Sequence, residues 1–285
     1  MSWYIKTYKT RKGIEEKVKY WVSDEGMNQK RDRKRAARRE ARRADGAEHI
    51  LARALNQNFD EGEDLHLVLE LDEKGMAKVE KRAEGYENEE KEDRILRALG
   101  QETQNFIRRL QRVEKGLKYI FVPSDLSKDR KTDRMKAARP HVHLIIRGAT
   151  LVNAREKWGL GEILVKELYN VKGDFHALAE YLLQQTRRVE GTKRYTPSRN
   201  LDKPEETEPV RVRIGGESMM RCPKGCVELY HSPYERGRNQ YMRYLRPATD
   251  ETTPPALRAT SQLCTPMAPH KGRQGRGKGG AARGR

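Results

Sequence analysis

The strongest constraint on the fold is a group of short apolar runs with the periodicity of β-strands. In residues 65–71 leucine occupies every second position, and mostly polar residues stand between the leucines. A period of two predicts a strand with one buried face. Residues 118–123 and 140–146 are two further apolar runs of strand length. We therefore expect three strands between residues 65 and 146.

Helical patterns separate and follow these strands. Apolar residues recur with helical spacing from Ile95 to Val113, and again in residues 174–183, where Asp174 is in position for an N-cap. Residues 73–93 are acidic and weakly patterned, which suggests an exposed insertion. The order strand, helix, strand, loop, strand predicts an α+β fold, with a central antiparallel sheet and helices on one of its faces.

The two ends of the chain differ in composition from its centre. Residues 1–22 are rich in aromatic residues and predict one or two strands, whereas lysine and arginine crowd residues 28–44 and predict a basic surface helix. Proline, glycine and arginine dominate after residue 247, and this composition predicts a disordered basic tail. We expect three parts: an N-terminal aromatic and basic extension (1–44), one compact domain with a C-terminal elaboration (45–246) and the tail (247–285).

The charge balance favours a polyanionic partner. The chain has a formal net charge of +18 and an isoelectric point near 9.8. A field of this sign attracts nucleic acid, although a merely solvated charged surface or an anionic membrane is the alternative. Within the basic helix we expect three arginines to contact DNA phosphates: Arg35, Arg38 and Arg39.

No segment predicts export or membrane insertion. The residues after Met1 lack the apolar core of a signal peptide, and no apolar stretch is long enough to cross a bilayer. Three cysteines can form too few disulfide bonds to stabilise a chain of 285 residues. We expect a cytoplasmic protein with no membrane partner.

Two histidines stand together in the third apolar run. Because side chains i and i+2 of a strand project to the same face, His141 and His143 project together. Two adjacent imidazoles on a rigid strand form half of a divalent-metal site, although two incidental histidines are the alternative. His49, His66 and His176 have no local partner in the sequence, and we expect structural or surface roles for them.

Tyr181 is the candidate nucleophile. It lies in the helix expected at residues 174–183, among apolar residues, where a tyrosine taken alone is more often a core residue. A metal ion that withdraws charge from a phosphodiester, together with a phenol that attacks phosphorus, is sufficient for transesterification.

These motifs together resemble the rolling-circle replication initiators of the His-hydrophobic-His (HUH) endonuclease superfamily. The nearest branch comprises the replication-associated proteins of filamentous phages and of Gram-positive plasmids and integrative elements. The resemblance covers roughly residues 45 to 204, with the motifs in the family's order. Its segments are Asn58-Phe59 with the strand that follows, 117–123, Arg139–Ile146, Trp158-Gly159, Leu178–Leu182 and Arg194–Pro204.

The resemblance implies a domain of the RRM or ferredoxin-like type and a site-specific nicking of one DNA strand that initiates rolling-circle replication. His141 and His143 would hold Mg²⁺ or Mn²⁺ against the scissile phosphate, and Tyr181 would become linked to the 5′ end of the cut strand. The substrate would be single-stranded DNA at an origin hairpin, contacted by Arg199 and Asn200 among others. A host helicase and polymerase would be the protein partners.

Two positions depart from the family pattern. The family's lysine three residues after the tyrosine is Gln184 here, which we take as its counterpart; the nearest cations that could supply the missing charge are Arg187, Arg188 and Lys193. The family's glutamate ligand before the histidine pair is replaced by Ser124-Asp125. Asp125 is therefore the candidate third ligand, with Glu70 and Asp72 as the other possibilities.

Two alternative functions remain open at this point. A related transposase or relaxase would use the same chemistry. A basic nucleic-acid-binding protein with a decayed metal site would keep the charge without the activity, which the two departures from the family pattern would explain.

Overall fold

The computed structural model describes residues 2–22, 35–36, 46–87, 89–129, 132, 134–186, 193–212, 218–233 and 239–247. Its elements are β1 (Ser2–Lys9), β2 (Ile14–Val22), α2 (Ala47–Asn58), β3 (Leu65–Glu70), α3 (Glu73–Ala83), α4 (Lys91–Val113), β4 (Lys118–Lys128), β5 (Met135–Arg147), α5 (Leu151–Trp158), β6 (Ile163–Lys166), α6 (His176–Gln184), β7 (Thr196–Pro197), β8 (Glu205–Glu206), β9 (Val210–Arg211), β10 (Val227–His231) and β11 (Gln240–Leu245). The expected α+β fold with antiparallel sheets is confirmed.

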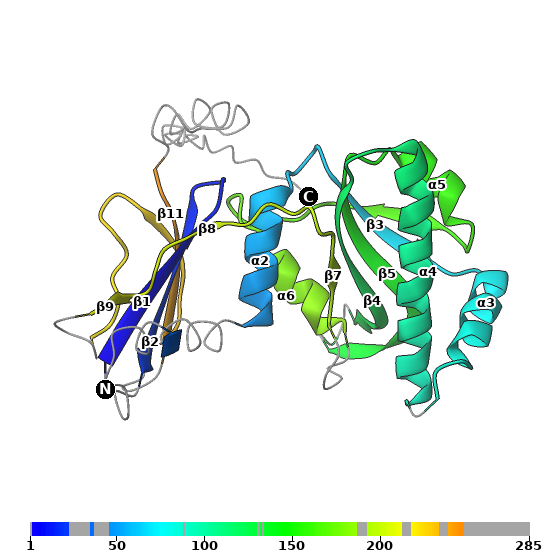
Figure 1. Ribbon diagram of the computed structural model, residues 1–285, viewed down its shortest axis with the longest axis horizontal. Coiled ribbons are helices and arrows are strands. Elements are labelled where there is room, and N and C mark those ends of the chain that lie inside the picture. The colour runs from blue at the N-terminus through cyan, green and yellow to red at the C-terminus, as the bar shows by residue number, and fades with distance from the viewer. Residues whose placement is uncertain are drawn as a thin grey trace, which may run out of the picture. The chain divides into compact units, whose positions relative to one another are not determined.

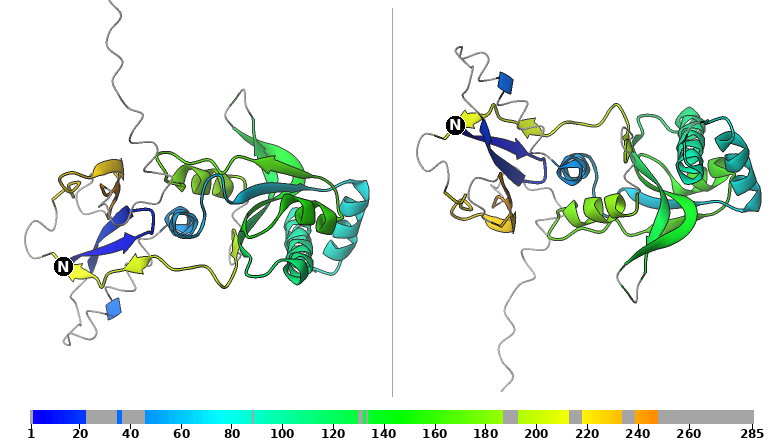
Figure 2. Two further views of the ribbon diagram at one scale, coloured as in Figure 1. Left: turned by 90° about the horizontal axis from the view of Figure 1, so that it is seen from above. Right: turned by 90° about the horizontal axis from the view of Figure 1, so that it is seen from below.

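The central sheet has five strands in the order β6-β3-β5-β4-β7, and every neighbouring pair is antiparallel. Four of the strands and their connecting helices follow the chain order β3-α4-β4-β5-α5-β6, with α3 preceding α4 (Figure 1). This β-α-β-β-α-β connectivity is that of a ferredoxin-like fold. Strands β4 and β5 continue beyond the end of β3 as a two-stranded arm (Figure 2).

Both faces of the central sheet are covered by helices. Leu67 and Leu144 lie on the face that packs against α3, α4 and α5, whereas Ile120, Val122 and Ile145 lie on the face that packs against α2 and α6. The expectation of helices on one face was wrong, because these strands carry apolar residues at alternate positions on both sides. An apolar face exposed to water would be costly, so the second pair of helices is needed.

The acidic segment at residues 73–93 is mostly exposed, as expected, but it is helical. It contains α3 and the first turn of α4, and Asp72 caps α3 by accepting a hydrogen bond from the Gly75 amide at 2.6 Å. Val79 and Ala83 are buried four residues apart on one side of α3. Because α3 buries so narrow a stripe, the segment has few apolar residues, and this explains why its helix was not predicted.

Gly75 allows the first turn of α3 to touch the backbone before β6. A β-carbon at this position would lie 2.0 Å from the carbonyl oxygen of Leu160. We expect Gly75→Ala to lower the free energy of unfolding by about 2 kcal/mol or more, because one of the two backbone segments must move. Urea denaturation measures the change.

Gly100→Ala is the matched control for this substitution. Gly100 lies inside α4, and its added β-carbon would meet only the Pro123 ring, at 3.6 Å. The better helix propensity of alanine should raise the free energy of unfolding by up to about 1 kcal/mol. If both substitutions changed the free energy of unfolding in the same direction, this account of Gly75 would be contradicted.

A second antiparallel sheet joins the N-terminal and C-terminal parts of the described chain. Its strand order is β10-β11-β2-β1-β8, and β9 also pairs with β1. The expected strands in residues 1–22 are present as the β1–β2 hairpin, and all of the other strands of this sheet come from residues 205–245. Residues 2–22 thus belong to the compact unit that ends at Pro247, which corrects the expectation of a separate N-terminal extension.

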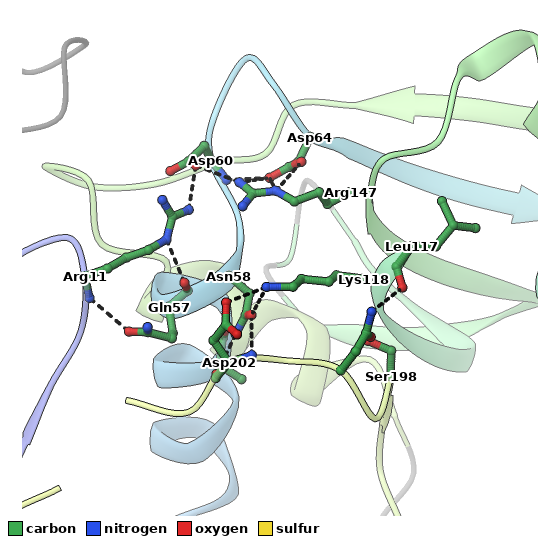
Figure 3. Close-up of polar contacts among 12 residues, drawn as sticks. Arg11, Gln57, Asn58, Asp60, Asp64, Leu117, Lys118, Arg147, Ser198 and Asp202 are labelled. Atoms are coloured by element: carbon green, nitrogen blue, oxygen red, sulfur yellow. Dashed lines mark hydrogen bonds and ion pairs between the residues drawn. The ribbon is translucent and has the colours of Figure 1, made fainter. Parts of the chain in front are cut away.

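Ion pairs connect the β1–β2 turn to the central sheet (Figure 3). Arg11 pairs with Asp60, with 2.5 Å between its Nη2 atom and the carboxylate, and Arg147 at the end of β5 pairs with both Asp60 at 2.6 Å and Asp64 at 2.8 Å. The two arginines share one carboxylate, so the turn after α2 holds the hairpin and the sheet together. The buried ion pair between Arg53 of α2 and Glu16 of β2, at 3.1 Å, also connects the hairpin to α2.

Among the described residues, none of the helices is both long enough and apolar enough to span a bilayer.

Candidate active site

The two histidines of β5 lie on the face of the central sheet that is covered by α2 and α6. His141 is opposite Glu70 and Ser124 on the neighbouring strands, and His143 is opposite Val68 and Val122. Their ring centroids are 5.1 Å apart, as the spacing of two residues in a strand requires. His143 is 3% exposed, whereas His141 is partly exposed at the margin of the face.

Helix α6 brings Tyr181 to this pair. Leu178, Leu182 and Leu183 are buried against the sheet, which leaves Tyr181 at the rim of the helix with 38% of its surface exposed. Its ring meets the ring of His143 edge-on, with 5.7 Å between centroids. The structure therefore combines a buried imidazole with a phenol whose hydroxyl group can reach a ligand at the surface.

The start of α6 is held by a buried carboxylate. Asp174 accepts hydrogen bonds from the His176 amide at 3.0 Å and from Asn56 Nδ2 at 2.9 Å, and it pairs with Arg243 of β11 at 2.6 Å. The N-cap position belongs to Phe175 rather than to Asp174, one residue later than expected. Two other elements, α2 and β11, thus fix the helix that carries Tyr181.

Burial keeps the central histidines neutral. Burial, together with the neighbouring His66 and His141, lowers the pKa of His143 to about 3, and burial lowers the pKa of His66 to about 4. Both imidazoles are therefore uncharged near pH 7. A neutral imidazole is the form that can donate a lone pair to a metal ion.

Hydrogen bonds fix the position of the protons on these rings. The carbonyl oxygen of Glu167 can only accept, so His66 Nδ1, 3.2 Å away, carries the proton. The neutral His66 then accepts, at Nε2, the Nδ1 proton of His143 across 3.2 Å. His143 Nε2 is left with its lone pair. His141 Nδ1 donates to the carbonyl oxygen of Arg139 at 2.9 Å, which leaves a lone pair on its Nε2 as well.

Gln185 faces the lone pair of His143. It is 2% exposed, and its Oε1 atom lies 3.1 Å from His143 Nε2. Its own Nε2 atom is buried with no hydrogen-bond partner within the described part of the chain. Two acceptor atoms at this distance need either a cation between them or an amide turned through 180°.

The donor atoms fit a hard divalent cation. His143 Nε2 and Gln185 Oε1, 3.1 Å apart, would be close enough to hold one ion together. The available donors would be two imidazole nitrogens, from His141 and His143, and one amide oxygen, from Gln185. This set has no negative charge, and imidazole ligands favour Mn²⁺ over Mg²⁺.

The expected third ligand is not assembled with the pair. In the described residues, no three His, Cys, Asp or Glu side chains are grouped so as to hold a metal ion. Asp125 is 7% exposed and lies at the irregular step between Ser124 and Leu126 of β4. Asp72 is occupied as the cap of α3, and Glu70 is exposed opposite His141.

The remaining residues expected in the site lie in several places, and some of them are outside the described residues. Gln184 donates to Glu180 within α6 at 3.1 Å, so the glutamine that contacts His143 is the next residue. Lys193, Arg199 and Asn200 are exposed, and so is Arg35. Four of the expected cations lie outside the described residues: Arg38, Arg39, Arg187 and Arg188.

Sequence reasoning missed His66 and Gln185. A structural or surface role was expected for His66 because it has no partner nearby in the sequence. Its contact with His143 arises because β3 pairs with β5 in a register that places Val68 opposite His143 and puts His66 on the same face. The alternation of residues 65–71 could have shown that face, but not the register.

Comparisons of the chain with protein-family models, with curated proteins and with solved structures find no match.

Proposed function

We propose that this protein is a metal-dependent endonuclease that nicks single-stranded DNA and initiates rolling-circle replication. The observation that carries the proposal is the position of Tyr181 beside a histidine whose lone pair points at an amide oxygen. A net charge of +18 agrees with a DNA substrate. The resemblance of the motifs to the HUH endonucleases supports the same chemistry.

His141, His143 and Gln185 would hold Mg²⁺ or Mn²⁺ in this proposal. When bound, the ion would withdraw charge from the scissile phosphate. The chain's own residues orient the reaction: His66 keeps the proton of His143 on Nδ1, and the packing of α6 holds the Tyr181 ring at the edge of His143. Burial of His143 excludes water from one side of the site.

The strand transfer exchanges one phosphodiester for another. The Tyr181 oxygen loses its proton and forms a bond to phosphorus, while the bond from phosphorus to the 3′ oxygen breaks. The upstream fragment leaves with a free 3′ hydroxyl group, and the downstream fragment remains attached through its 5′ phosphate. Since no bond energy is lost to water, the reverse reaction can rejoin the strand.

The partners follow from this product. The free 3′ hydroxyl is a primer for a host polymerase, and a host helicase would separate the strands. Exposed cations such as Lys193 and Arg199 would hold the strand by its phosphates. We place the reaction in the cytoplasm, where replication intermediates are found.

A capture experiment tests the proposal. Hairpin-bearing single strands with random sequence are incubated with the protein and Mn²⁺, and covalent adducts are separated under denaturing conditions. The proposal expects strands labelled at the 3′ end to travel with the protein and strands labelled at the 5′ end to be released as shorter fragments. Strands that bind without any adduct, at any sequence and with either metal, would favour a DNA-binding protein with a decayed site.

His66 should act as a positioning residue for metal binding. We expect His66→Ala to weaken Mn²⁺ binding by about tenfold to 100-fold, because His143 Nδ1 loses the acceptor that orients the ring. His66→Gln keeps an acceptor oxygen in reach and should restore most of the affinity. Calorimetric titration with Mn²⁺ measures both variants, and equal losses in the two would show a merely structural role.

A further inference from the structure

A pocket of about 540 Å³ lies on the opposite side of the central sheet from the histidine pair. It is formed by α4, the start of β4 and the loop after β7, and its polar and aromatic lining includes Gln104, Arg108, Gln111, Tyr119, Arg199 and Asn200. Tyr119 packs with the core beneath α4, whereas His143 faces α2 and α6. The pocket is therefore separate from the candidate active site.

The strand register gives the distance along β5 between the pocket and the histidine pair. Tyr119 is opposite Ile146 of β5, and His141 lies near the other end of the same paired segment. At about 3.3 Å per residue, the two positions are roughly 16 Å apart along β5. A single nucleotide could not touch both places.

Two arginines from different elements, Arg108 of α4 and Arg199 of the loop after β7, line the pocket together with Tyr119. Burial raises the pKa of the Tyr119 hydroxyl, and Arg199 and Arg108 act against this effect, which places both cations near the ring. Both arginines are exposed at the mouth of the pocket. Guanidinium groups bind phosphate oxygens with two parallel hydrogen bonds.

The frame of the pocket is fixed by hydrogen bonds between β4 and the loop (Figure 3). The Ser198 amide donates to the Tyr119 carbonyl oxygen at 2.8 Å, and the Tyr119 amide donates to Ser198 Oγ at 3.1 Å. Asn200 Nδ2 donates to the Leu117 carbonyl oxygen at 3.1 Å. Asn200 therefore has a structural role in the loop, and the loop on both sides of Arg199 is bonded to β4 and to Leu117 without a ligand.

We infer that this pocket binds one nucleotide of a DNA strand, outside the nicking centre. Arg108 and Arg199 would hold its phosphate, and Tyr119 would stack on its base. The side-chain amides of the lining would meet the edge of the base. The volume is within the usual range for a bound ligand of this size, and stacking on an aromatic ring tolerates any base. The identification of the ligand as DNA rests on the proposed function.

Binding of a short labelled single strand tests the inference in a Tyr181→Phe background, where the strand stays intact. The double variant Arg108→Gln, Arg199→Gln should bind about tenfold more weakly. The slope of log affinity against log salt should fall by about 0.7 for each lost phosphate contact. Arg112→Gln is the matched control, because Arg112 is an exposed arginine of α4 that does not line the pocket. An equal loss in this control would overturn the inference.

Photocrosslinking gives a second measurement that depends on the stacked base. Strands with 5-iododeoxyuridine at successive positions should crosslink to Tyr119 from one position. The absence of this crosslink at all positions would refute the pocket as a nucleotide site. If a free deoxynucleoside monophosphate bound as tightly as the strand, the ligand of the pocket would be a free nucleotide and not a DNA strand.

These measurements are independent of catalysis. A strand that crosslinks to Tyr119 while the wild-type protein forms no covalent adduct would refute the nicking activity and leave the pocket standing. An adduct formed at Tyr181 with no effect of the arginine variants would refute the pocket alone.

Discussion

Replacing Tyr181 with phenylalanine is expected to reduce the yield of covalent protein–DNA adduct at least about 1,000-fold. The variant keeps the ring that packs beside His143 and removes only the oxygen that would attack phosphorus. Tyr181 is 38% exposed, and its hydroxyl group makes no hydrogen bond to the described residues, so the protein should remain folded and should still bind the strand. A strand labelled at its 3′ end, separated on a denaturing gel after incubation with Mn²⁺, measures the adduct.

Tyr169→Phe provides the control for this experiment. Tyr169 is 51% exposed and lies between β6 and α6, outside the site. This variant should form the adduct at the wild-type rate. An adduct that persists in Tyr181→Phe would mean that a different residue is the nucleophile, and an equal loss in both variants would mean that the effect is not specific.

Replacing Gln185 with glutamate is expected to tighten Mn²⁺ binding by about tenfold to 100-fold. The substitution keeps an oxygen atom 3.1 Å from His143 Nε2 and adds a negative charge to a set of otherwise neutral donors. Affinity for hard divalent cations rises with the number of charged ligands. Gln185→Leu removes the oxygen and should weaken binding, and calorimetric titration compares the three proteins.

Gln184 offers a matched control because it is the neighbouring residue of the same type. Its side chain is exposed and bonded to Glu180, so Gln184→Glu adds the same charge on the solvent side of the helix. Screening by water should limit the change in Mn²⁺ affinity to less than about threefold. If Gln184→Glu tightened binding as much as Gln185→Glu, then Gln185 would not be a ligand.

The fold of the centre was largely predictable because its strands and helices have strong local periods. The two-residue period of residues 65–71 identified β3, and the helical spacing from Ile95 to Val113 identified α4. Helix α3 was missed since only three of its residues are buried. The second sheet was also missed, because the pairing of β1 with strands from residues 205–211 has no local signal.

The candidate site, like the fold, was predictable only in part. The pairing of His141 with His143 follows from the alternation of side chains in a strand, and the contact of His143 with Tyr181 agrees with the order of motifs in the family that the chain resembles. The contacts of His66 and Gln185 depend on strand register and on where a helix ends. Both are set by tertiary packing, which a sequence pattern does not contain.

The second sheet also implies an order of assembly during synthesis. Its ion pair between Lys6 and Glu206 closes a separation of 200 residues, and a two-stranded hairpin is at best marginally stable alone in water. Folding of residues 46–204 brings the two ends closer and shortens the loop that must be closed. In a growing chain, Asp174 at the start of α6 can receive its partner Arg243 only after the strands of the central sheet have been synthesised. The helix that carries the nucleophile would be the last part of the site to become rigid, so an incomplete chain would hold Tyr181 less firmly than the finished protein.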